Sequence, residues 1–229
     1  MLDVFFDKWW RVGGVAGILF VIMVIVAAGL SGDTPTFDKP ADEIRDWFAD
    51  NGDQFLVGNF IFGLAFAFFF FPFLAGLRSL LGAAEGGPRV WSTVAFAGGV
   101  SWLALGAVVS LFWATLAFSF GVVEQGDDVP VKTLMYLDQV GTAVLTLPLI
   151  PLILGATLVS LRTRVLWRWL AVIAAVAIVF DAINGANVLT SDADGALGGV
   201  GFIGFLASAL WILLVSVNMI LKREAPAQA

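Results

Sequence analysis

The fold is decided by a long apolar stretch at residues 133–161, which reads TLMYLDQVGTAVLTLPLIPLILGATLVSL. It exceeds the roughly 20 residues that an α-helix needs to cross about 30 Å of hydrocarbon. It lacks the alternation of a membrane β-strand, and lipid does not tolerate an open sheet edge. The stretch therefore predicts a transmembrane α-helix.

The rest of the chain shares this apolar character. Of its 229 residues, 60% are hydrophobic and 13% are charged, and the mean hydropathy is +0.95. Soluble domains are about half apolar and about one quarter charged, so the composition indicates an integral membrane protein. We expect an all-α fold that forms one domain over residues 1–229. The six expected spans are residues 12–30, 55–77, 90–123, 133–161, 165–189 and 196–221.

The distribution of basic residues predicts the orientation, because cytoplasmic segments of membrane proteins are enriched in Lys and Arg. With six spans, Lys39, Arg45 and Lys132 fall on one side of the membrane. All other basic residues fall on the opposite side, which also holds both termini. We therefore expect both termini in the cytoplasm. The residues on that side are Lys8, Arg11, Arg78, Arg89, Arg162, Arg164, Arg168, Lys222 and Arg223.

The first outer loop, residues 31–54, contains a helix signal of its own. Pro40 followed by acidic residues is typical of a helix start. Ile44, Trp47 and Phe48 follow at positions i, i+3 and i+4, so they share one face. We expect a short amphipathic helix on the outer membrane surface or over the end of the bundle. It serves either as a lid that packs on the bundle or as a docking surface for a partner.

The third span carries tryptophans at regular intervals, at Trp91, Trp102 and Trp113. Eleven residues make almost three full helical turns, so the three side chains lie on one stripe. Two interpretations stay open. The stripe packs against neighbouring helices, or it forms a wall for a flat apolar ligand.

The fourth and fifth spans each contain an aspartate, Asp138 and Asp181. A carboxylate inside an apolar span is costly and calls for a partner, so we expect the two acids to meet in the outer half of the membrane. Their role is either structural, through hydrogen bonds, or the handling of protons or cations. The expected polar cluster comprises Asp138, Asp181, Tyr136, Gln139, Asn184, Asn187 and Asn59.

Two residue types are missing from the sequence, cysteine and histidine. Their absence excludes thiol nucleophiles, His-ligated haem, the usual zinc sites and a Ser-His-Asp triad. The chain also has no complete catalytic motif. We expect no enzymatic activity, no cofactor, no metal site and no nucleic-acid partner.

Two further segments carry a resemblance to a known group of proteins. They are PFLAGLRSLL at residues 72–81 and RVLWRWLAVIAAV at residues 164–176, which accompany the acidic first outer loop. With these features the chain resembles a broad class of six-helix bacterial membrane proteins, similar to actinobacterial ones, that has no assigned activity. The preference for Arg over Lys, with abundant Ala, Gly and Val, indicates a GC-rich bacterium. The resemblance implies a multi-pass protein of the bacterial cytoplasmic membrane.

These observations favour a non-enzymatic role. We expect a binding protein or accessory subunit that contacts membrane lipids, an apolar ligand, or a larger membrane complex. The partner is a membrane protein or a second copy of the chain. The alternative is a small proton- or cation-coupled transporter that uses Asp138 and Asp181.

Overall fold

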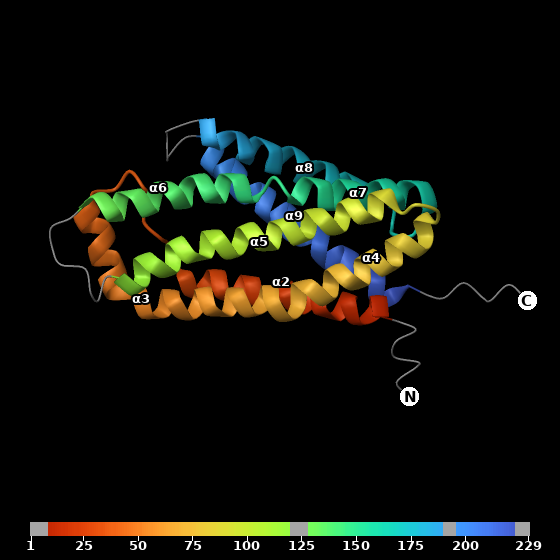
Figure 1. The fold of residues 1–229 in the computed structure, drawn as a ribbon, viewed down its shortest axis with the longest axis horizontal. Helices are drawn as coiled ribbons and strands as arrows, with labels where there is room; N and C mark the ends of the chain where they lie inside the picture. The colour runs from red at the N-terminus through yellow and green to blue at the C-terminus, as the bar shows by residue number, and fades with distance from the viewer. Residues whose placement is uncertain (1–8, 120–127, 190–195, 223–229) are drawn as a thin grey trace, which may run out of the picture.

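The computed structural model describes residues 9–119, 128–189 and 196–222, and these residues are almost entirely helical. The helices run back and forth along one long axis (Figure 1). Six helical segments are long and apolar enough to cross a membrane, which confirms the predicted number of spans. In chain order the elements are α2 (Trp9–Ser31), α3 (Ala41–Leu64), η1 (Ala65–Phe70), α4 (Phe71–Glu85), α5 (Val90–Ser119), α6 (Asp128–Leu145), α7 (Leu149–Thr163), α8 (Leu170–Ala186), η2 (Asn187–Leu189) and α9 (Ala196–Leu221).

The observed helices differ from the predicted spans at several ends. The second span begins at Ala41, because the amphipathic turns of the first loop continue into it without a break. The fifth begins at Leu170, because Arg164 ends α7 in a left-handed conformation with φ 59° and the chain turns there. The predicted end of the third span at Val123 lies outside the described residues.

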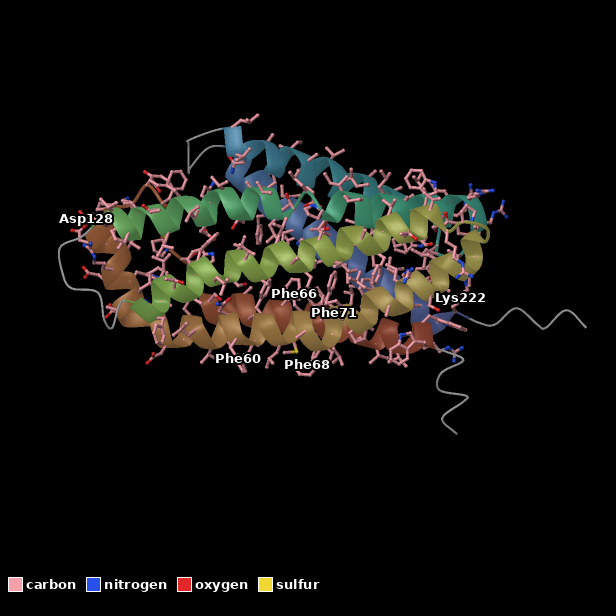
Figure 2. All side chains as sticks on the ribbon, viewed as in Figure 1. Phe60, Phe66, Phe68, Phe71, Asp128 and Lys222 are labelled. Atoms are coloured by element: carbon pink, nitrogen blue, oxygen red, sulfur yellow. The ribbon has the colours of Figure 1, made fainter. Side chains whose placement is uncertain are left out.

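The second span widens into a π-helix, η1, immediately before Pro72. Proline has no N–H to donate, and its ring clashes with the carbonyl four residues earlier. A π-helical turn accommodates that clash within a continuous helix. Phe66 in this turn is buried, whereas Phe60 and Phe68 are each 66% exposed and point away from the bundle (Figure 2).

The fourth span is interrupted between α6 and α7, where Pro148 stands. Instead of α-helical hydrogen bonds, the N–H groups of Leu147 and Leu149 donate to carbonyls three residues earlier, over 3.1 Å each. Pro148 and Pro151 cannot donate to the Val144 and Leu147 carbonyls, and the N–H groups of Leu147 and Ile150 bond to these carbonyls instead. The two prolines of the opening stretch therefore place an irregular backbone in the middle of a span.

Both ends of the described chain lie at the same end of the bundle (Figure 1). The Arg11 guanidinium at the start of α2 donates to the Lys222 carbonyl after α9, over 3.1 Å. Nearby, α2 and α4 approach so closely that a methyl group added at Gly13 would lie 2.8 Å from the Gly76 Cα. Lys222 marks this end, and Asp128 marks the opposite one (Figure 2). We call them the Lys222 end and the Asp128 end.

A second, smaller core closes the Asp128 end. The first turns of α3 cross the end of the bundle before the helix runs along it (Figure 1). Ile44 and Phe48 are 0% and 2% exposed and pack in one cluster with Phe55 and Leu116. Trp47 is partly buried against the same cluster. The predicted apolar face therefore points onto the bundle.

Candidate ligand pocket and buried carboxylates

A pocket of about 330 Å³ lies toward the Asp128 end, among α2, α3, α5, α6 and α9. Its volume falls in the range of small-molecule sites, and apolar and aromatic side chains form most of its wall. It reaches the connection between α2 and α3 at Gly32 and Thr34. The wall residues used below are Phe55, Asn59, Gly106, Trp113, Thr142 and Phe205.

Three polar side chains of the pocket wall donate hydrogen bonds within the protein. The Asn59 amide donates to the Ser110 carbonyl over 3.2 Å, and the Ser31 hydroxyl donates to the Ala27 carbonyl over 3.0 Å. The Thr142 hydroxyl donates to the Asp138 carboxylate over 3.2 Å. The oxygen atoms of these side chains remain as acceptors. The pocket is therefore suited to an apolar molecule with a hydrogen-bond-donating polar group.

Asp138 faces the bundle because it belongs to the buried stripe of α6. Val131, Met135 and Asp138 recur at helical spacing and are all buried. Asp138 is 8% exposed, and Thr142 and Trp113 are its hydrogen-bonding neighbours. Both neighbours line the pocket, so the carboxylate lies directly behind the pocket wall.

Asp181 is 0% exposed and lies deeper, on the buried stripe of α8. Its Oδ2 accepts a hydrogen bond from Ser208 on α9 over 2.8 Å. Its Oδ1 has no hydrogen-bond partner among the described residues. At the break between α6 and α7, the Thr146 hydroxyl donates to the Asp181 carbonyl over 3.1 Å and accepts from the Asn184 amide over 3.4 Å.

Two glycines of α9 make room for this second polar group. A methyl group added at Gly204 would lie 2.8 Å from the Asp181 Oδ1, and one at Gly201 would lie 2.2 Å from the Asn184 Oδ1. Helix α9 can approach these polar side chains closely only because glycine has no side chain at these two positions. The small residues of α9 thus form the wall of the Asp181 cluster, which we define as Asp181, Asn184, Thr146 and Ser208.

The two aspartates lie in separate surroundings. Asp138 bonds to Thr142, whereas Asp181 lies against Thr146. From Asp138 to Thr146 the chain advances eight residues, or about 12 Å along a helix. No hydrogen bond joins the two carboxyl groups within the described ranges, and neither has a basic partner there, since Arg45–Asp128 at 2.7 Å is the sole ion pair in them.

A small cavity of about 20 Å³ separates the pocket from Ser208. Val24, Phe62 and Phe205 line both spaces, and Ser208 lines only the small cavity. That volume is enough for about one water molecule. The small cavity therefore lies between the pocket and Ser208 of the Asp181 cluster.

The remaining predicted residues of the polar cluster are distributed as follows. Asn59 lines the pocket, and Asn187 is buried in η2. Gln139 is half-buried on α6. Tyr136 is 53% exposed, and its ring lies 5.5 Å from that of Phe37 rather than beside Asp138.

The three tryptophans of α5 lie in three different environments. Trp91 is 42% exposed near the Lys222 end. Trp102 is 5% exposed and contacts a group of phenylalanines, with ring centroids 4.9 Å from Phe66 and Phe70. Trp113 lines the pocket and contacts Phe55 at 5.1 Å. Only Trp113 is in a position to touch a ligand in this pocket.

Sequence reasoning missed Thr142, Thr146, Ser208 and Gly106. Thr142 stands four residues after Asp138, a spacing that brings side chains together on a helix, so it carried a local signal. Ser208 and Gly106 reach the site only through helix packing. Among the described residues there is no group of three or more acidic, His or Cys side chains able to hold a metal ion.

No protein-family model matches the sequence, and no curated protein or solved structure matches the chain.

Proposed function

We propose that this protein is a non-enzymatic binding protein of the bacterial cytoplasmic membrane, whose ligand is an apolar molecule with one polar end. The observation that carries the proposal is the pocket of about 330 Å³ bordered by Phe55, Trp113 and Phe205. In this proposal both termini are cytoplasmic, and the Asp128 end is the outer one. The exposed apolar helix faces contact membrane lipids or a larger membrane complex.

The electrostatics of the pocket select the polar end of the ligand. Asp138 lies behind Thr142, and no basic side chain of the described residues lines the pocket. Carboxylate, hydroxyl and amide oxygens attract a donor or a cation and repel an anion. The proposed ligand therefore ends in a hydroxyl, amide or amine group, and its apolar part lies along the aromatic wall.

The first turns of α3 complete the proposed site. Phe48 packs on both Phe55 and Trp113, with ring centroids 5.5 and 6.1 Å apart. Phe55 and Trp113 line the pocket directly. In this role, residues 41–54 form a lid over the outer end of the pocket, and its position controls how a ligand enters.

A photo-crosslinking experiment tests the proposal. A long-chain alcohol carrying a diazirine is incorporated into lipid nanodiscs with the protein, irradiated, and mapped by peptide mass spectrometry. We expect labelling of the α5 and α6 residues that face the pocket. Gly106→Leu should reduce it, because a methyl group at Gly106 has 3.8 Å of clearance but a longer side chain enters the pocket.

Gly63→Leu is the matched control for this experiment. Gly63 is exposed on α3, and no atom lies within 4 Å of a methyl group added there. This variant should be labelled like the wild type. Equal labelling of the two leucine variants, or labelling confined to exposed helix faces, would refute the proposal.

A second candidate function is transport of protons or small cations. It is supported by two buried carboxyl groups without a basic partner in the described ranges, and by the cavity that brings Ser208 close to the pocket. In proteoliposomes with a pH-sensitive dye, Asp138→Asn and Asp181→Asn should each abolish flux. The control Asp50→Asn changes an exposed acid of α3 and should not. Absence of flux in the wild type would eliminate this candidate.

A further inference from the structure

A second cavity lies at the Lys222 end, far from the proposed ligand pocket. It has a volume of about 460 Å³ and lies between α4 and α5. Two arginines line it, Arg78 from α4 and Arg89 from the turn before α5, together with the hydroxyl-bearing residues Ser79, Ser92 and Thr93. We call this cavity the basic groove.

The arginines of the basic groove are held in place by apolar contacts rather than by acids. The Arg78 guanidinium lies over the Phe96 ring, 4.9 Å from its centroid, which is a cation–π contact. The Arg89 side chain folds over Gly82, since a methyl group there would lie 3.4 Å from the Arg89 Cδ. Both side chains are therefore directed along the groove wall and leave their charge available.

The acid closest to the groove in sequence lies at the edge of the groove, beside Ser92 of its wall. Glu85 accepts hydrogen bonds from the backbone N–H groups of Trp91 and Ser92, both over 2.8 Å, at the start of α5. It acts there as a helix cap. Neither Arg78 nor Arg89 forms an ion pair within the described ranges. Two arginine charges thus face one carboxylate at the groove edge, and this excess of positive charge attracts an anion.

The backbone of Arg89 has a strained conformation. Its φ is +52°, a left-handed conformation that is uncommon for residues other than glycine. The two preceding glycines in the same turn, Gly86 and Gly87, also have positive φ. Asparagine or glycine would fit position 89 with less strain.

We propose that the basic groove binds a phosphate group through the guanidinium groups of Arg78 and Arg89. Arginine offers planar paired donors that match phosphate oxygens. The Ser79 hydroxyl lies in the same wall, whereas those of Ser92 and Thr93 already donate to the Arg89 carbonyl over 3.1 and 2.8 Å. The phosphate comes from an anionic lipid headgroup or from a soluble phosphorylated compound, and this site is separate from the ligand pocket.

Two binding arms distinguish the sources of the phosphate. In the first, native mass spectrometry counts phosphatidylglycerol molecules retained by the protein in mild detergent. In the second, inorganic phosphate is added to the protein in phosphatidylcholine nanodiscs, and the rise in melting temperature is measured against equimolar chloride. Binding in the first arm identifies a lipid headgroup, and binding in the second arm alone identifies a soluble phosphate compound.

The variants are designed to leave the fold intact, because both arginines are exposed. Arg78→Gln and Arg89→Gln should each lower retention or stabilisation at least fivefold. Ser79→Asp keeps both arginines but adds a repelling carboxylate, and it should have the same effect. Arg168→Gln removes one exposed charge from the same end, outside the groove, and should bind like the wild type. Equal losses in Arg168→Gln and the groove variants, or no binding in either arm, would overturn the proposal.

Discussion

Gly204 on α9 provides a sharp test of the packing around Asp181. In Gly204→Ala the new methyl group would lie 2.8 Å from the Asp181 Oδ1 and 3.2 Å from the Asp181 backbone nitrogen. Backbone atoms of α8 cannot move aside easily, so we expect overpacking to cost about 1–3 kcal/mol. The higher helix propensity of alanine offsets up to about 1 kcal/mol of this cost.

Gly63→Ala separates these two contributions. It carries the same change in propensity, but its methyl group meets no atom within 4 Å. The two variants should therefore differ in free energy of unfolding by about 1–3 kcal/mol, with Gly204→Ala the less stable. The assay is equilibrium unfolding in mixed detergent micelles with increasing SDS, followed by far-ultraviolet circular dichroism. Equal stabilities would show that α9 does not approach Asp181 as described.

Three further predictions concern the ends of the bundle. Arg45 and Asp128 should couple by less than about 1 kcal/mol in a double-mutant cycle, because the Asp128 side chain is 67% exposed; a coupling that persists in high salt would contradict this. Glu85→Ala should lower the free energy of unfolding by about 0.5–2 kcal/mol through loss of the α5 cap; unchanged stability would refute that role. Burial lowers the pKa of Lys222, so its charged form is disfavoured in the fold and this cost disappears as pH rises toward the unfolded pKa. Wild type should thus gain stability relative to Lys222→Gln between neutral and alkaline pH, whereas parallel pH profiles would contradict the burial.

The spans were predictable because apolar length alone defines a membrane helix. Helix breaks were partly predictable, since Pro148 and Pro151 were visible inside the fourth span. The sequence did not reveal which residues stabilise the irregular turn. The Thr146 side chain in this turn forms hydrogen bonds with residues of α8, which is distant in sequence. The continuity of Ala41–Glu85 was also missed, since polarity suggested a loop where the backbone simply continues as helix.

The candidate site was predictable by residue type but not by geometry. Asp138 and Asp181 were identified because carboxylates are rare in apolar spans. The two carboxyl groups are separate because their helix faces pack against different neighbours. Asp181 packs against Ser208 and Gly204 of α9. The basic groove was missed because arginines at span ends are expected from orientation alone, and only packing shows that two of them share a cavity.

The central claim is that the pocket at the Asp128 end holds an apolar ligand. Native mass spectrometry of the protein purified from its source membrane in mild detergent tests it directly. We predict one small apolar molecule per chain, lost in Gly106→Leu and retained in Gly63→Leu. A wild-type protein that carries no such molecule, or a ligand that both variants retain equally, would contradict the account.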